Sequence, residues 1–139
     1  MSQVAQRLQH IRERMQAAAA RAGRDPGDTE LMAVSKIFSV RDIHEAVAAG
    51  QTLFGENRVQ EALSKIPALP PHLRWHLIGP LQSNKVRKIL PCVETIQSID
   101  CLDIARKAQR IATELDLRMK VYLEVNIAGE DTKHGFTTG

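Results

Sequence analysis

Aromatic residues supply only 4% of the 139 residues, so aliphatic side chains and alanine must fill the core. Cysteine is also scarce. Cys92 and Cys101 are too few for a disulfide framework, and their spacing matches no zinc motif. We therefore expect two reduced thiols in a cytoplasmic protein without a metal site.

Long apolar runs and clustered charge are missing as well. No apolar run approaches the ~18 residues that a membrane helix needs, and the polar N-terminus lacks the continuous apolar core of a signal peptide. The net charge of +3 comes from scattered basic residues, without a basic face or a nucleic-acid-binding motif. We expect neither membrane nor nucleic-acid partners. Hydrophobic and charged fractions of 43% and 25% indicate a single globular domain.

What the sequence does contain is an alternation of helices and short apolar strands. An N-terminal helix ending near Gly23 is predicted from one apolar stripe at helical spacing: Val4, Leu8, Ile11, Met15 and Ala18. Five strands are predicted after it, in the segments ELMAVS, TLFGE, RWHLIG, VETIQS and MKVYLEVNI.

The helices between these strands carry start signals. Ser39 and Asp42 predict a capping box, whereas Asn57 and Asp100 are the candidate caps of two later helices. The helix after Asp100 is expected to bury one face, made of Ile104, Ala108, Ile111, Ala112 and Leu115.

Such alternation implies a parallel sheet covered by helices. Two architectures compete. An open, doubly wound sheet of five strands would be complete at this length, whereas a (β/α)8 barrel needs ~250 residues. The absence of a G-x-G-x-x-G motif and of a Walker loop weakens a nucleotide-binding interpretation.

Lys36 is the first candidate functional residue, because it ends a strand that is otherwise apolar. Alternation along the strand puts Met32, Val34 and Lys36 on one face, and active sites of parallel α/β proteins lie at the carboxyl ends of strands. A lysine held partly out of water is more readily neutral, and a neutral amine can form a Schiff base with an aldehyde. The alternative is a lysine that reaches water at a strand end.

Other polar clusters follow later strands at the same end of the sheet. They contribute Asn57, which could cap a helix or contact a ligand, and Asn84, which follows the third strand. His76 lies within that strand, where a hydrogen-bonded core histidine is the common alternative. His72 and His76 would be ~13 Å apart in an extended chain, which argues against a metal pair.

Together the segments LMAVSK, AVAAGQTLFGENRVQE, RWHLIGPLQSNK, TIQSID and VNIAGEDTKHG resemble the pyridoxal 5′-phosphate (PLP) homeostasis protein family, which is related in fold to the N-terminal barrel of alanine racemase. The resemblance spans nearly the whole chain. It implies a (β/α)8 TIM-barrel-type fold with an extra N-terminal helix. It also implies PLP held as an internal aldimine on Lys36, with Asn57, His76 and Asn84 as possible lining residues.

The chain departs from the family pattern in two ways. Phe38 stands where members often carry a second lysine. Members also continue through roughly three more βα units, so we expect residues 1–139 to form one PLP-binding barrel domain that is truncated after about five βα strands. The family's phosphate contacts come from the missing part. Members are monomers, and a truncated chain would have open sheet edges for association.

The resemblance implies a role in intracellular PLP (vitamin B6) homeostasis with little or no turnover. The alternative is a PLP-dependent racemase-like enzyme, which needs a second acid/base group opposite Lys36. Tyr122 lies in mid-strand and neither cysteine ends a strand, which argues against this alternative. A third possibility is a scaffold without a cofactor.

Overall fold

Five short strands form one parallel sheet in the computed structural model, which describes residues 1–139. Their order in the sheet is the order in the chain, and β1 and β5 form the two edges. The strands are Ala33–Val34 (β1), Leu53–Glu56 (β2), Arg74–Leu77 (β3), Thr95–Ile99 (β4) and Lys120–Leu123 (β5).

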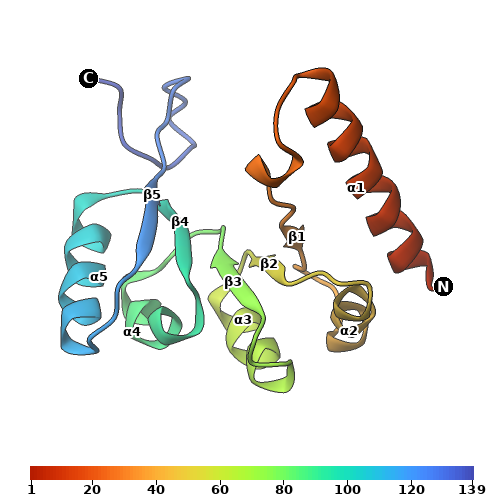
Figure 1. Ribbon diagram of the computed structural model, residues 1–139. Coiled ribbons are helices and arrows are strands. Elements are labelled where there is room, and N and C mark those ends of the chain that lie inside the picture. Colours follow the sequence, from red (N-terminus) through yellow and green to blue (C-terminus); the bar gives the residue numbers. More distant parts are fainter.

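Helical segments connect each strand to the next, and one long helix precedes the sheet. The α-helices are Gln3–Arg21 (α1), Val40–Ala48 (α2), Val59–Lys65 (α3), Val86–Ile89 (α4) and Leu102–Glu114 (α5). Short 3₁₀ turns occupy Pro26–Asp28 (η1), Ile66–Ala68 (η2), Ser83–Lys85 (η3) and Leu90–Cys92 (η4). α1 lies beside β1 at one edge of the sheet, and the segment after β5 lies at the other edge (Figure 1). None of these helices combines the length and apolar character needed to cross a membrane.

The strand order excludes one of the two predicted architectures. A doubly wound sheet reverses its strand order at a switch point, and this sheet has no reversal, so that alternative is wrong. Right-handed crossovers that always advance in one direction place their helices on the same face of the sheet. The protein therefore has an α/β fold in which the connecting helices cover one face of the sheet and leave the other face uncovered.

The core lies between the sheet and these helices. Phe54 of β2 and Trp75 of β3 stack with their ring centroids 5.3 Å apart. Aliphatic side chains complete the layer, among them the fully buried Leu77, Val86 and Ile96. This single aromatic pair surrounded by aliphatic residues is the packing that the scarcity of aromatic residues predicts.

The register aligns the strands so that their carboxyl ends meet at one edge of the sheet. Val34 pairs with Gly55, Gly55 with His76, and His76 with Thr95. The loops that follow β1, β2 and β3 therefore start from adjacent positions.

One predicted helix cap is confirmed and two are wrong. The capping box of α2 is present, with the Asp42 N–H donating to Ser39 Oγ at 3.2 Å and the Ser39 N–H donating to Asp42 Oδ2 at 2.9 Å. Asn57 does not cap α3, because Arg58 holds the N-cap position without a side-chain hydrogen bond. Asp100 does not cap α5 either, because the chain reaches the N-cap geometry one residue later, at Cys101.

The apolar patterns of the sequence predict more buried residues at the ends and edges of the fold than the structure has. Only Leu8 of the predicted α1 stripe is buried, because α1 lies at the sheet edge and packs mainly against α2. Leu115 is 37% exposed at the C-cap of α5, although the other four residues of its predicted face are buried. β1 has two residues where the apolar segment predicted six.

Candidate functional site

Lys36 lies in a tight turn directly after β1. The Phe38 N–H donates to the Ser35 carbonyl at 3.1 Å, so Lys36 and Ile37 are the two central residues of the turn. Ile37 has a φ of 64°, a positive value that type II turns require at this position. The Lys36 side chain is exposed, so the expected withdrawal of its amine from water is not present in this chain.

The two faces of the sheet near this turn differ in character. Ser35 faces the helices, where its hydroxyl donates to Glu56 Oε1 at 2.7 Å. Met32 lies on the opposite face, since its sulfur is 3.0 Å from the position that a Cβ on Gly55 would take and 3.9 Å from the Gln97 amide nitrogen. Met32 and Ser35 thus point to opposite faces, as the predicted alternation requires.

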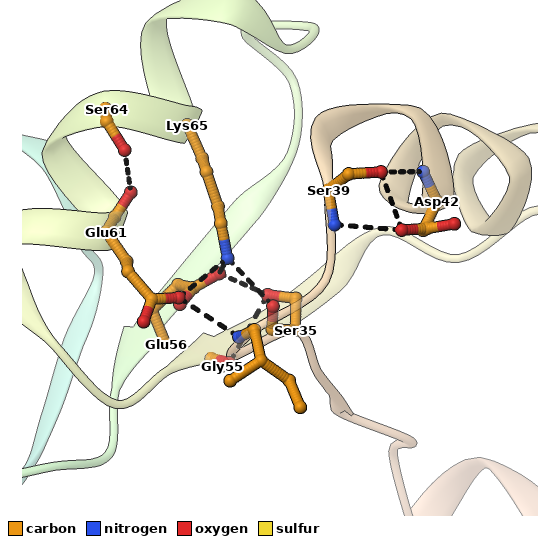
Figure 2. Close-up of polar contacts among 9 residues, drawn as sticks. Ser35, Ser39, Asp42, Gly55, Glu56, Glu61, Ser64 and Lys65 are labelled. Carbon is orange, nitrogen blue, oxygen red and sulfur yellow. Dashed lines mark hydrogen bonds and ion pairs between the residues drawn. The ribbon is translucent and has the colours of Figure 1, made fainter.

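A cluster of charged side chains supports the turn from the helix side (Figure 2). We call Ser35, Glu56, Glu61 and Lys65 the Lys65 cluster. The buried Lys65 ammonium donates to the Ser35 carbonyl at 2.9 Å, to Glu56 Oε1 at 2.9 Å and to Glu61 Oε2 at 3.0 Å. Burial acts to lower the pKa of Lys65, but hydrogen bonds to both carboxylates outweigh it and leave this pKa raised.

Glu61 connects the cluster to the turn itself. Its Oε2 accepts a hydrogen bond from the Ile37 N–H at 3.1 Å. Hydrogen bonds from Lys65 and then from Ile37 hold the pKa of Glu61 below its usual value. The carboxylate is therefore ionised and bonded to the backbone next to Lys36.

Sequence reasoning missed the Lys65 cluster, although two signals were present. Glu56 is a carboxylate in the segment TLFGE, which is predicted as an apolar strand, and a charge that is buried there needs a partner. Glu61 and Lys65 have the i, i+4 spacing of a helical ion pair. What the sequence could not indicate is that both reach across to the loop after β1.

The loops after β2 and β3 touch at Asn57 and Gly79. A Cβ on Gly79 would lie 1.9 Å from the Asn57 carbonyl oxygen and 2.6 Å from Asn57 Oδ1. Beside this contact is a hollow of about 310 Å³, whose lining includes Arg58 and Lys85 together with Asn57. Its amide and two cationic side chains suit a polar, anionic group.

His76 and Asn84, the other two predicted site residues, lie apart from the turn. His76 Nε2 is 2.9 Å from Glu94 Oε1, and its Nδ1 is 2.9 Å from the Gln97 amide nitrogen. Both ring nitrogens thus have partners within the protein. Asn84 is exposed in η3, and no hydrogen bond joins it to Lys36.

The contact between His76 and Glu94 belongs to a wider ionic network. Arg74 donates two hydrogen bonds to Glu94, at 3.0 and 2.7 Å, and also pairs with Glu30. The hydrogen bonds from Arg74, aided by His76 and opposed by burial, lower the pKa of Glu94 to about 2. This network lies toward the amino ends of β3 and β4, at the opposite end of the strands from Lys36.

The family is decided by comparison with known proteins. A model of the alanine racemase N-terminal domain matches residues 6–138, which is nearly the whole chain. The chain belongs to the alanine racemase N-terminal domain family. A curated relative from Pseudomonas aeruginosa, named pyridoxal phosphate homeostasis protein, is 41% identical over 138 residues. That match covers 97% of this chain and 59% of the relative, so the chain spans about three-fifths of the relative's length.

Solved structures of similar proteins share the fold. A protein described as unknown, from Bifidobacterium adolescentis, superposes with a TM-score of 0.87 at 36% identity, over 96% of this chain and 58% of that one. PipY of Synechococcus elongatus, solved with PLP bound, gives a TM-score of 0.74 at 39% identity, over 96% of this chain and 58% of PipY. The α/β architecture with its parallel sheet is therefore that of the family.

Proposed function

We propose that this protein binds PLP and acts in intracellular PLP homeostasis, with the cofactor held covalently on Lys36. The observation that carries the proposal is the position of Lys36, an exposed amine in a supported turn at the carboxyl end of β1. The similarity to PipY, which was solved with PLP, and to relatives named PLP homeostasis proteins adds to it.

The residues at this edge suit such a group. A primary amine that has lost its proton can condense with an aldehyde, with loss of one water molecule, and the exposed Lys36 side chain is accessible to such a group. Asn57 lies on the neighbouring loop and is the best placed of the other predicted lining residues. His76, whose nitrogens are bonded to Glu94 and Gln97, and Asn84 remain predictions from the resemblance.

We also propose that the sheet is an arc of a (β/α)8 barrel. Strands in chain order, with their helices on one face, are the arrangement of such a barrel, and the second face carries Met32, His76 and Gln97 as interior side chains would be. The family members that match are longer than this chain, which leaves length for further strands. Association through the edges at β1 and β5 and a cytoplasmic location remain predictions.

Of the two predicted functions, PLP binding with little or no turnover fits the site better than racemisation. Racemisation needs a second acid/base group across the reacting carbon from the lysine. Tyr122 lies on β5 at the far edge of the sheet with 62% exposure, and Cys101 is exposed at the start of α5. Neither side chain lies at the β1 edge of the sheet, so the racemase alternative rests on the family match alone.

The test is to add PLP to the 139-residue chain and record the absorbance band of a Schiff base, at about 420 nm. Borohydride reduction, intact mass and peptide mapping then locate the bond. We expect one adduct on Lys36, which Lys36→Ala abolishes and Lys88→Ala, a change at an exposed lysine on α4, leaves intact. An adduct that is unchanged in Lys36→Ala contradicts the proposal.

A further inference from the structure

Ile37 adopts a backbone conformation that its side chain disfavours. Its φ of 64° lies in the left-handed region, where a β-branched residue is a genuine outlier. Strain of this kind persists only where surrounding contacts impose it. The Ile37 side chain is 85% exposed, so its own packing does not impose the conformation.

Two side chains of α3 hold the backbone on either side of Lys36. Glu61 accepts the Ile37 N–H at 3.1 Å, and Lys65 donates to the Ser35 carbonyl at 2.9 Å. Figure 2 shows both side chains extending from α3 toward the turn. They are one helical turn apart, so a single helix face meets the residue before Lys36 and the residue after it.

Lys65 is itself fixed within the Lys65 cluster. Glu56 Oε1 receives hydrogen bonds from Lys65 and from Ser35, whereas Glu56 Oε2 is buried without a partner. A buried carboxylate with one unsatisfied oxygen depends strongly on the cation that remains. Glu56 of β2 therefore helps α3 to fix the position of the Lys65 ammonium. The hydrogen bond from this ammonium to the Ser35 carbonyl depends on both elements.

α3 does not need these contacts to be anchored. Val59 and Ala62 of α3 are buried in the core, with exposed fractions of 3% and 0%. The Glu61 carboxylate could have reached solvent, yet it turns to the Ile37 N–H. Glu61 Oε2 pairs with Lys65 within α3 and also accepts the Ile37 N–H, so it joins the turn to a helix that core packing already anchors.

From these contacts we infer that Glu61 and Lys65 are positioning residues for Lys36, which keep the strained turn in the conformation that presents the lysine amine at the sheet edge. The part of this inference that concerns the cofactor rests on the proposed function. The part that concerns the turn stands on the contacts of the chain alone.

The first experiment measures amide hydrogen exchange at Ile37 in the wild type and in Glu61→Ala. Loss of a hydrogen bond to a charged acceptor should speed exchange at this amide by about tenfold or more. Glu61→Gln keeps an acceptor oxygen and should give a smaller increase. Glu114→Ala is the matched control, because it removes a carboxylate in an i, i+4 ion pair on α5, away from the turn. Unchanged exchange at Ile37 in a folded Glu61→Ala overturns the inference.

The second experiment measures PLP affinity from the Schiff-base absorbance. Glu61→Ala should weaken binding by about tenfold, the loss expected when the turn is no longer held. Adding Ile37→Gly should restore most of the affinity, because glycine adopts a positive φ without strain. A purely structural role of Glu61 in α3 predicts no such rescue, so absence of rescue counts against the inference.

Failure of the proposed function is separable from failure of this inference. If the wild type takes up no PLP, the proposed function fails, while exchange at Ile37 still tests whether Glu61 holds the turn. Lys65→Met is a less suitable probe, since it leaves Glu56 buried without a cation and endangers folding.

Discussion

Gly79 is the residue at which the loops after β2 and β3 meet. A Cβ there would lie 1.9 Å from the Asn57 carbonyl oxygen, a backbone atom that cannot move alone. We expect Gly79→Ala to lower the free energy of unfolding by about 2 to 4 kcal/mol, because the loop that carries Asn57 must shift. Urea unfolding followed by circular dichroism measures this change.

Gly55 supplies the matched control at the residue scale. Like Gly79 it is buried and has no positive φ, but it lies within β2, and a Cβ there would meet the flexible Met32 side chain, with the sulfur at 3.0 Å. A methionine can change rotamer, so Gly55→Ala should cost distinctly less than Gly79→Ala. Equal losses in the two variants would show that close backbone approach at Gly79 is not the cause.

At the scale of residues, the sequence predicts only part of the candidate site. The positions of Lys36 and Asn57 after their strands follow from the alternation of apolar segments. The support of the Lys36 turn by Glu61 and Lys65 does not, because it joins residues 24 and 30 positions apart through the packing of α3. Such contacts depend on tertiary geometry, which no local pattern records.

At the scale of elements, α5 begins without a side-chain cap. Cys101 holds the N-cap position with extended backbone angles, φ −155° and ψ 160°, but makes no capping hydrogen bond. Cys101→Ser introduces a hydroxyl oxygen that can accept the Ile104 N–H. We expect the free energy of unfolding to rise by about 0.5 to 1 kcal/mol, measured in urea.

Two further variants separate capping from the loss of a thiol. Cys101→Ala also removes the sulfur but offers no acceptor, so it should give no increase. Cys92→Ser makes the same chemical change at the other cysteine, which lies in η4 away from any helix N-cap, and should not stabilise. A gain in Cys101→Ala equal to that in Cys101→Ser would contradict the capping explanation.

The element boundaries show where sequence patterns stop being sufficient. Ser39 and Asp42 were predicted as a capping box because both partners lie within one turn, and the structure confirms it. The caps of α3 and α5 were missed by one residue because strand ends, not local preference, decide where those helices start. β1 is shorter than its apolar segment because only Ala33 and Val34 pair with β2.

Across the whole molecule, one ionic network joins segments that are distant in sequence. Glu30, before β1, pairs with Arg74 of β3, and Arg74 and His76 both bond to Glu94, before β4. The Arg74 hydrogen bonds are the main cause that lowers the pKa of Glu94 from 4.5 to about 2. Because this value lies below that of the unfolded chain, the network stabilises the fold above about pH 4.5, and the stabilisation is lost as pH falls toward 2.

The stability difference between the wild type and Glu94→Gln should therefore depend on pH. Since the Glu94 side chain is 33% exposed, solvent screening limits the difference to about 1 to 2 kcal/mol at pH 7. Urea unfolding between pH 7 and 2.5 should show it shrink below about pH 4.5, where the carboxyl is protonated in the unfolded chain. In an Arg74→Gln background the same substitution should have a small, nearly pH-independent effect, because the chief cause of the lowered pKa is gone. A wild-type difference that stays constant down to pH 2.5 would mean that Glu94 does not link these strands electrostatically.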